Sequence, residues 1–168
     1  MSGLLRNILA LIAGLFSYGR CNPEEITTIT LWATPWDTGW RVVKSDKYLQ
    51  FAETAQIDYL LKTGLFFSLL SRKIGFVNLA QTVRFFKPVS RFSAIQVSTQ
   101  LIYSDEKRAF FSHRIHAGAD LAAEVLVKMK FKQGRLTVAP STILPVAFTS
   151  EPAQVKAWNA CLNEPSAS

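Results

Sequence analysis

Cysteine is scarce in this chain, whose 168 residues include only Cys21 and Cys161, near opposite ends. A disulfide framework or a zinc site needs more ligands at closer spacing, so neither is expected. Two unrelated thiols indicate a reducing compartment, which favours a cytoplasmic protein, with or without membrane association. The sequence also lacks a metal-binding motif and a Gly-x-Ser-x-Gly nucleophile elbow. We therefore expect no metal and no cofactor.

Acidic residues are scarce as well. Twelve Asp and Glu stand against 19 Lys and Arg, which gives a formal net charge of +7. No run of Lys or Arg resembles a nucleic-acid-binding arm, so nucleic acid is not expected as a partner. Phosphorylated small molecules, acidic partners and anionic membrane surfaces remain compatible with the positive charge.

A long apolar run is missing too. The apolar segment Ile8–Phe16 has roughly half the length that a membrane-spanning helix needs. No small-x-small cleavage site of a signal peptide follows it. Its spacing predicts a short amphipathic helix within residues 1–20. This helix either packs on the domain, which is slightly favoured, or contacts a membrane surface through Leu4–Phe16.

The abundant residues indicate one folded domain. Hydrophobic residues make up 49% of the chain and charged residues only 18%, which excludes disorder for most of it. We expect a domain over residues 24–148 and a C-terminal helix and tail over residues 149–168. The length suits a single core.

The hydrophobic period changes once along the domain. An alternating strand at Ile26–Thr34 precedes a helix at Lys47–Thr63, for which Ser45 is the expected N-cap and Gly64 the end. From Ile74 onward the period is two, which predicts four long strands: Phe76–Lys87, Ala94–Ser104, Lys107–His116 and Ala119–Lys132. A terminal helix is predicted at Glu151–Leu162.

The order of these elements predicts an α+β fold. One long helix cannot cover both faces of such an antiparallel sheet, so we expect the curved sheet to wrap around the helix, as in the hotdog fold. The unused edge of the sheet favours a homodimer, or a dimer of dimers.

Several motifs then resemble a known family. Pro35-Trp36-Asp37 stands where acyl-CoA thioesterases of the hydroxybenzoyl-CoA thioesterase type have Pro-x-Asp, and Tyr48-Leu49 followed by Glu53 matches their Tyr-Leu and acid. The segments 57–64, 83–88 and 104–107 resemble the helix end, the basic-aromatic strand and the following hairpin of the same family. More narrowly, the chain resembles the thioesterase-superfamily-member-six-like branch, whose members also carry a hydrophobic N-terminal segment. The resemblance implies a hotdog protein that binds an acyl-CoA or carrier-bound acyl substrate.

The sequence departs from the family where the chemistry is expected. Gly39 occupies the position of the second acid of the family's Asp-x-Asp, and Val42–Ser45 replaces His-Met-Asn-Asn. In many relatives that second acid is the catalytic carboxylate. The resemblance therefore implies a degenerate catalytic loop.

Three acids near the predicted helix start are the catalytic candidates: Asp37, Asp46 and Glu53. Thioester hydrolysis needs a carboxylate near the carbonyl and N–H donors for the oxyanion, and a helix N-terminus supplies such donors. Asp37 is interpreted equally well as a residue that caps a turn. Asp46 is better interpreted as a residue that stabilises the helix dipole than as a catalytic acid. Glu53, on a mostly apolar face, is expected to be paired or functional if it is buried.

The candidate substrate-binding residues are aromatic and basic: Trp36, Trp40, Tyr48, Phe51, Arg84 and Lys87, with Arg91 as a further cation for phosphate. The aromatic residues form either an apolar pocket or core. His113 and His116 fall on opposite faces of a strand and are expected to be structural.

Three functions remain open at this stage. The first is hydrolysis of an acyl thioester with a hydrophobic acyl group. The second is non-hydrolytic chemistry, such as cyclisation, dehydration or isomerisation of a hydrophobic biosynthetic intermediate. The third is a catalytically inactive ligand-binding or scaffold protein.

Overall fold

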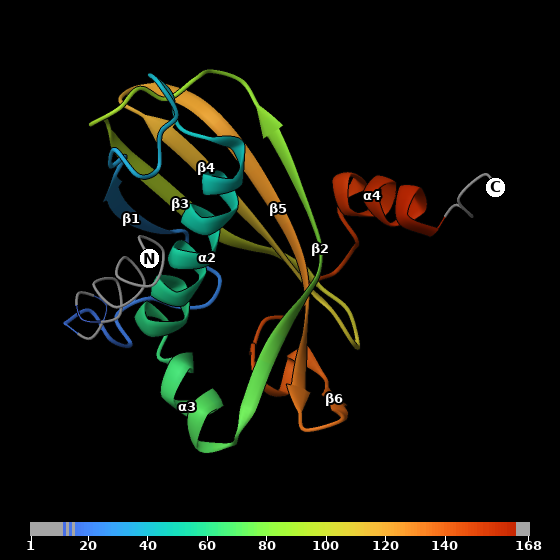
Figure 1. Cartoon of the computed structure of the whole chain (residues 1–168). Helices are drawn as coiled ribbons and strands as arrows, with labels where there is room; N and C mark the ends of the chain where they lie inside the picture. Colours follow the sequence, from blue (N-terminus) through green and yellow to red (C-terminus); the bar gives the residue numbers. More distant parts are fainter. Residues whose placement is uncertain (1–11, 13, 15, 164–168) are drawn as a thin grey trace.

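The computed structural model describes residues 12, 14 and 16–163, and its helices and strands follow the predicted order (Figure 1). The elements are β1 (Thr27–Trp32), α2 (Ser45–Lys62), α3 (Leu65–Ser71), β2 (Ile74–Phe85), β3 (Ala94–Ser104), β4 (Ala109–Ala117), β5 (Asp120–Gln133), β6 (Leu136–Val138), a 3₁₀ turn (Pro140–Thr142) and α4 (Ala153–Asn163). The predicted strand boundaries differ from these by two residues or fewer.

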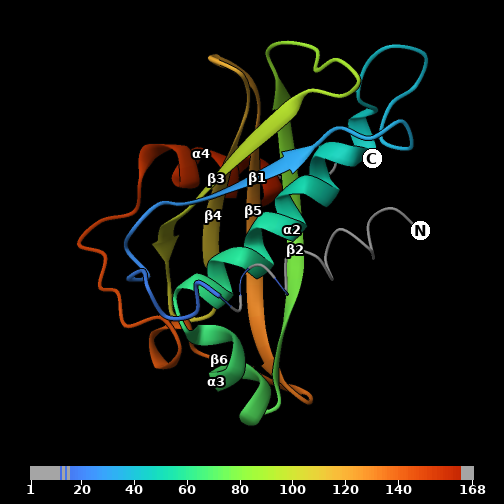
Figure 2. The same cartoon turned by 90° about the vertical axis from the view of Figure 1, so that its left-hand side faces the viewer.

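The strands form one antiparallel sheet in the order β1-β3-β4-β5-β2, with β6 paired to β5. The sheet curves around α2, which lies across its inner face (Figures 1 and 2). This arrangement confirms the predicted hotdog fold. Strands β1 and β2 are the two ends of this five-strand order, and the short β6 pairs only with β5.

The core lies between α2 and the inner face of the sheet. Alternate residues of β5 from Ala123 to Phe131 are buried there, as the period of two predicts. From the helix, Phe51 and Tyr59 enter the same core, and both are fully buried. Burying one such aromatic side chain contributes roughly 1.5–3 kcal/mol.

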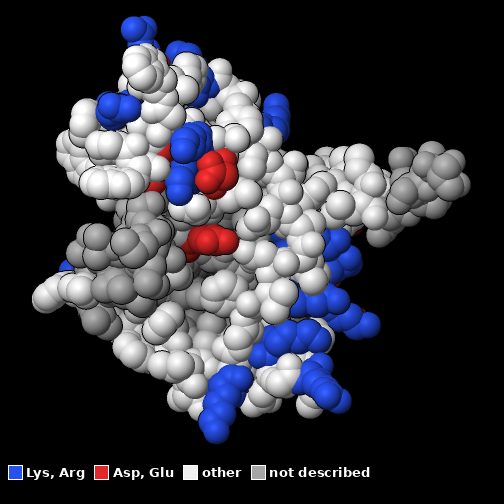
Figure 3. All heavy atoms as spheres, in the orientation of Figure 1, with Lys and Arg blue, Asp and Glu red and all other residues white. Residues whose placement is uncertain are grey.

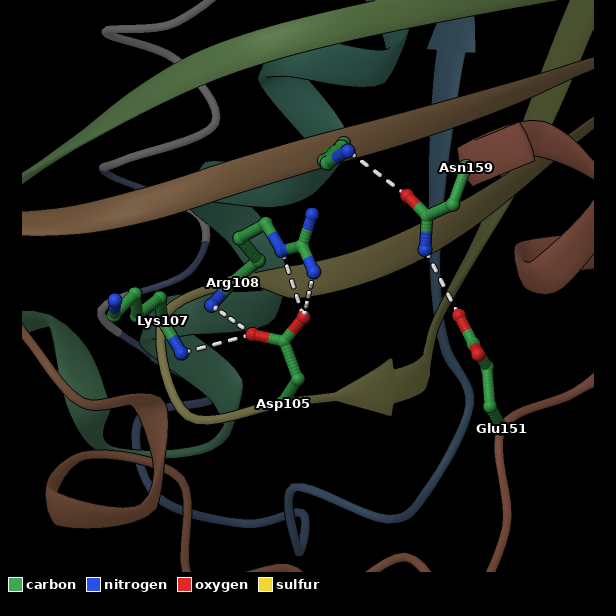
Figure 4. Close-up of polar contacts among 6 residues, drawn as sticks. Asp105, Lys107, Arg108, Glu151 and Asn159 are labelled. Carbon is green, nitrogen blue, oxygen red and sulfur yellow. Dashed lines mark hydrogen bonds and ion pairs between the residues drawn. The ribbon is translucent and has the colours of Figure 1, made fainter. Parts of the chain in front are cut away.

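The outer face of the sheet is partly covered by α4. Phe110 of β4 stacks edge-on against Trp158 of α4, and the Lys128 Nζ donates a 2.8 Å hydrogen bond to Asn159 Oδ1. Asn159 in turn donates to Glu151 (Figure 4). Leu126, the apolar exception on the polar face of β5, is buried, and by the alternation of the strand it shares this face with Lys128.

The hairpin between β3 and β4 is closed by one carboxylate. Asp105 Oδ1 accepts the backbone N–H groups of Lys107 and Arg108, and its Oδ2 accepts from the Arg108 guanidinium at 2.7 Å (Figure 4). The local carboxylate thus fixes the turn that the sequence predicts there.

The described part of the N-terminal segment packs on the end of α2. At Gly14 an added Cβ would lie 2.5 Å from Leu61 Cδ1 and 3.1 Å from Leu61 Cβ, so any larger residue would require the buried Leu61 side chain to shift. The Tyr18 hydroxyl donates to the carbonyl of Gly64 at 2.6 Å. Packing is therefore observed at residue 14, whereas most of the predicted amphipathic helix, with Leu4–Leu11, lies outside the described residues. Within the described residues, no helix is both long and apolar enough to cross a membrane.

One detail of the predicted helix start is wrong. Ser45 is the first residue of α2, and Lys44, with extended backbone angles, holds the N-cap position. No side chain of the described residues caps this end by a hydrogen bond. The first turn of α2 therefore keeps backbone N–H groups without a side-chain acceptor.

Candidate functional site

A pocket of about 290 Å³ lies at the N-terminus of α2. We call it the helix-start pocket; its lining residues are Val43, Ser45, Tyr48, Phe85, Phe86, Lys87 and Pro88. The helix supplies Ser45 and Tyr48, and the end of β2 with the loop after it supplies the other wall. Apolar and aromatic walls next to a helix N-terminus suit an apolar group that carries a polar or anionic end.

Tyr48 is a buried residue that lines the helix-start pocket. Its ring packs edge-on against Phe85 at 5.1 Å and Phe51 at 6.1 Å between ring centroids. Burial raises the pKa of the Tyr48 phenol, and a hydrogen bond with the Val89 backbone opposes this rise. Tyr48 therefore remains a neutral, well-fixed hydroxyl at neutral pH.

A second, larger pocket of about 630 Å³ lies on the other side of Lys87 and Pro88. We call it the outer pocket; its lining residues are Lys87, Pro88, Ser90, Ser93, Ala94, Ala117, Gly118, Asp120 and Ala122. The Lys87 Nζ lies 2.6 Å from Asp120 Oδ1, and both side chains are largely exposed. Lys87 and Pro88 thus belong to both pockets.

Asp37 is buried and holds the loop before α2. Its Oδ2 accepts the backbone N–H of Thr34 at 3.0 Å and the Thr34 hydroxyl at 2.6 Å. Its own backbone N–H donates to the carbonyl of Thr34. These contacts correspond to the turn-cap interpretation, and Asp37 lines neither pocket.

Asp46 and Glu53 are both exposed on α2. Asp46 is in the first turn, directly after the pocket-lining Ser45, with one oxygen 3.9 Å from the Lys47 Nζ. Glu53 faces solvent two turns later, so the burial that would require a partner does not occur. Asp46 is the nearer of the two, in sequence, to the residues of the helix-start pocket.

The three candidate phosphate-binding cations do not lie together in the structure. Lys87 lines both pockets. Arg84 lies on the outer face, 3.9 Å from Glu124 and over the ring of Phe86. Arg91 donates to the hydroxyl of Thr38 and to two loop carbonyls, which makes it a brace of the loop before α2. Of the three, only Lys87 is placed to meet a ligand in these pockets.

The four candidate aromatic residues do not line one common pocket either. Phe51 is core, whereas Trp36 and Trp40 are exposed and line neither pocket. The structure therefore brings Tyr48 and Lys87 together in one pocket and leaves the two tryptophans outside it.

His113 is fully buried between α2 and the sheet, and its Nδ1 lies 3.0 Å from the Thr99 hydroxyl. Burial lowers the pKa of His113 to about 3, so its imidazole is neutral in the folded protein. His116 pairs with Gln96 on the opposite face. This placement agrees with the structural role expected of both histidines, and among the described residues no cluster of His, Cys, Asp or Glu could hold a metal.

Sequence reasoning does not identify Asp120 or the pocket role of Ser45. Asp120 lies 33 positions after Lys87 and meets it only because β5 pairs with β2. A serine before a helix is typical of an N-cap, so the sequence predicts that role for Ser45 and not a position in the pocket wall. Only the three-dimensional pairing of the strands reveals the Lys87–Asp120 contact.

Solved structures share this fold. A probable thioesterase from Escherichia coli is 18% identical, with a TM-score of 0.64, and the match covers 70% of this chain and 92% of that one. The gentisyl-coenzyme A thioesterase BH1999 is 17% identical, with a TM-score of 0.66 and coverage of 71% and 100%. A hypothetical protein from Staphylococcus aureus, solved in complex with CoA, is 15% identical, with a TM-score of 0.59 and coverage of 88% and 91%.

No curated protein matches the chain in sequence. A family model of the thioesterase-like superfamily, however, matches residues 35–157, a stretch that contains every residue lining the two pockets. The order of the strands, the single inner helix and this match agree with one another, and the chain belongs to the thioesterase-like superfamily.

Proposed function

We propose that this protein hydrolyses an acyl thioester whose hydrophobic acyl group occupies the helix-start pocket. The observation that carries the proposal is the position of this pocket at the open N-terminus of α2. Two structural relatives, a gentisyl-coenzyme A thioesterase and a protein solved with CoA, support a CoA thioester as the first substrate class to test. An acyl group on a carrier protein presents the same thioester.

The helix start offers electrostatic stabilisation to the reacting carbonyl. In the proposed complex the carbonyl oxygen accepts hydrogen bonds from the first backbone N–H groups of α2, where the helix dipole favours negative charge. Asp46, in the same turn, accepts a proton from a water molecule whose oxygen attacks the carbonyl carbon. The carbon–sulfur bond then breaks, and the proton passes to the leaving thiolate, which gives a carboxylic acid and a thiol.

Lys87 is the proposed contact for the phosphate groups of the carrier arm. It borders both pockets, so an arm that leaves the helix-start pocket toward the outer pocket passes its ammonium group. A phosphate would replace the exposed carboxylate of Asp120 as its partner. This arrangement assigns the acyl group to one pocket and the phosphate-bearing arm to the other.

We also propose that the protein is a homodimer. In the described sheet, β2 pairs only with β5, so its other edge has unpaired backbone groups. Phe76, Val77 and Leu79 of β2 are exposed there. Pairing of two copies along β2 would cover both features. A dimer of dimers and a cytoplasmic location, with or without membrane association, remain predictions from the sequence.

One observation favours the alternatives to hydrolysis. None of the residues that line the helix-start pocket is an acid, and Gly39 stands where the family's second acid is expected. A pocket without a carboxylate suits non-hydrolytic chemistry on a hydrophobic intermediate, or ligand binding without turnover. The role of Asp46 therefore decides between these functions.

The decisive experiment measures thiol release from a series of acyl-CoA esters, aliphatic and aromatic, by the full chain. Asp46→Asn should lower kcat by about 10²–10⁴-fold, the usual contribution of a general base. Glu53→Gln, on the solvent side of the same helix, is the matched control and should leave kcat unchanged. Lys87→Met should raise KM roughly tenfold, because a hydrogen bond to a charged group is lost.

The same assay separates the alternatives. Wild-type turnover no faster than that of Asp46→Asn would exclude Asp46 as the base. Saturable binding of acyl-CoA without thiol release would support a binding protein. An acyl group that is still attached to its carrier but has changed in mass would support non-hydrolytic chemistry.

A further inference from the structure

Large apolar side chains are exposed together at the end of the molecule next to the helix-start pocket. Trp36 is 74% exposed, Trp40 89% and Phe92 65%. They come from two loops, residues 33–44 and 86–93, which lie at the same end of the molecule in both views (Figures 1 and 2). We call this surface the aromatic tip; its apolar members are Trp36, Trp40, Val42, Phe86 and Phe92. Exposed apolar groups gathered in this way mark interaction surfaces.

Hydrogen bonds hold the two loops in a fixed shape. The guanidinium of Arg91 donates to Thr38 Oγ1 and to the carbonyls of Gly39 and Trp40, each at 3.1 Å. A β-bridge joins Val42 to Ser90 across the loops. The exposed rings are therefore presented by an ordered scaffold.

Phe92 itself has an uncommon backbone conformation. Its φ of +63° lies in the left-handed region, which is unfavourable for a bulky side chain. Its N–H donates to the carbonyl of Ala33 at 2.9 Å, which fixes this conformation. The fold thus keeps an aromatic ring exposed where glycine would be less strained, and such strain is typical of a functional surface.

The charge of the tip is one-sided. Arg41, Lys44, Lys87 and Arg91 are exposed in or beside the two loops. The only acid in residues 33–44 and 86–93 is Asp37, which is buried. Figure 3 shows several Lys and Arg side chains over this upper end of the molecule, with acidic side chains beside some of them. The exposed acids next to the tip are Asp46 and Asp120, and Asp120 is paired with Lys87. A second copy of the tip would bring the same positive charge, so self-association through it is disfavoured.

We propose that the aromatic tip binds an anionic membrane surface. Tryptophan prefers the headgroup level of a bilayer, and each nearby Lys or Arg is attracted to anionic lipid. Phe86 and Lys87 belong both to this end and to the helix-start pocket, so binding turns the pocket toward the lipid. The proposed membrane contact differs from the one that the sequence predicts through Leu4–Phe16, and it does not depend on thioesterase activity.

Cosedimentation of the full chain with vesicles tests the proposal. Vesicles of phosphatidylcholine mixed with phosphatidylserine should bind the protein, with a blue shift of tryptophan fluorescence, whereas phosphatidylcholine alone should bind it weakly. The double variant Trp36→Ser/Trp40→Ser should bind at least about tenfold more weakly, because two buried indoles are lost. Arg41→Gln and Lys44→Gln should each weaken binding about fivefold.

Two matched controls lie at the opposite end of the sheet. Arg135, next to β6, and Leu136, within it, are both exposed, and Arg135→Gln and Leu136→Ser should bind like the wild type. Thermal unfolding checks that each variant folds, which the exposed positions favour.

Three results would overturn the proposal. The first is wild-type protein that does not bind anionic vesicles. The second is tip variants that bind as well as the wild type, which would move the contact to the N-terminal segment. The third is a wild-type dimer that becomes a monomer in Trp36→Ser/Trp40→Ser by light scattering, which would make a second copy the occupant of the tip.

Discussion

The two ends of helix α2 differ in how their polar groups are satisfied. At the C-terminal end, the Lys62 Nζ lies 2.7 Å from Asp58 and donates at 2.7 Å to the carbonyl of Thr28 in β1. At the N-terminal end, Lys44 occupies the cap position, and no side chain of the described residues accepts from the first turn. The C-terminal end therefore anchors the helix to the sheet. At the N-terminal end the Lys47 N–H donates to the Lys44 carbonyl at 3.1 Å, and the N–H groups of Ser45 and Asp46 are the donors that we propose for a ligand.

Buried polar groups strengthen this contrast. Burial raises the pKa of Asp58, and Lys62 opposes the rise. Burial also raises the pKa of Tyr59, whose hydroxyl donates to the carbonyl of Pro23 in the segment before β1. With the function proposed above, stability depends on one end of α2 and activity on the other, and the following predictions test that proposal.

The largest effect is expected from the two tyrosines of α2. Tyr59→Ala should lower the free energy of unfolding by about 3–5 kcal/mol, because it removes a fully buried ring. The surviving folded fraction should keep the KM of the wild type. Tyr48→Ala, at the pocket, should raise KM as well as lower stability. Urea unfolding and acyl-CoA kinetics on both variants provide the measurement, and an unchanged KM in Tyr48→Ala would contradict the assignment.

Acid should destabilise the protein through His113. Its pKa is about 3 when folded and about 6.5 when unfolded, so between these values the unfolded chain binds more protons. Stability is therefore complete above pH 6.5 and falls by up to about 1.4 kcal/mol per pH unit as the pH decreases toward 3.

The His113 contribution can be isolated. Unfolding between pH 7 and 4.5 should show a flatter pH dependence in His113→Gln, whereas His116→Gln should keep the wild-type slope. If His113→Gln does not fold, titration of the wild-type imidazoles by NMR measures the same quantity, and a His113 pKa near 6.5 would contradict the prediction.

A smaller effect is expected where the N-terminal segment meets the end of α2. Gly14→Ala places a methyl group against Leu61, and overpacking of this kind costs about 1–3 kcal/mol. Gly75→Ala is the matched control, because an added Cβ there meets no atom within 4 Å. Equal stability of the two variants would show that residue 14 does not pack on α2.

The fold could be predicted from the sequence because its signals are local. Alternation along β5 determines which residues face α2, and the turn at Asp105 determines the hairpin. Leu126 breaks that alternation and is buried on the outer face, where α4 contacts Phe110 and Lys128, and the packing of α4 on this face has no signal near residue 126.

The site could be predicted only in part. Tyr48 and Lys87 do line the helix-start pocket, because their motif positions are set by α2 and β2. The exposure of Trp36 and Trp40 could not be predicted, since an aromatic residue in a loop fits a core, a pocket or a surface equally well. Arg91 resembles a phosphate ligand by charge alone, and only its three hydrogen bonds reveal a brace.

The open start of α2 is tested most directly by giving it a cap. Lys44 has φ −70° and ψ 148°, the extended conformation of an N-cap residue, so Lys44→Asp can accept from the first turn without rearrangement. It should raise the free energy of unfolding by about 0.5–2 kcal/mol. Lys44→Gln removes the positive charge without a favourable cap and is the first control. Lys44→Glu makes the same change of charge as Lys44→Asp without a favourable cap and is the second, and it should keep the kcat/KM of Lys44→Gln within about threefold.

The decisive measurement is the acyl-CoA hydrolysis rate of Lys44→Asp, without lipid, beside its stability. If the carbonyl of the substrate binds at the first turn, the new cap occupies its donors, and kcat/KM should fall at least about tenfold below that of Lys44→Gln, as expected for a lost oxyanion donor. A more stable Lys44→Asp protein with the kcat/KM of Lys44→Gln would contradict the central claim that the start of α2 is the thioester site.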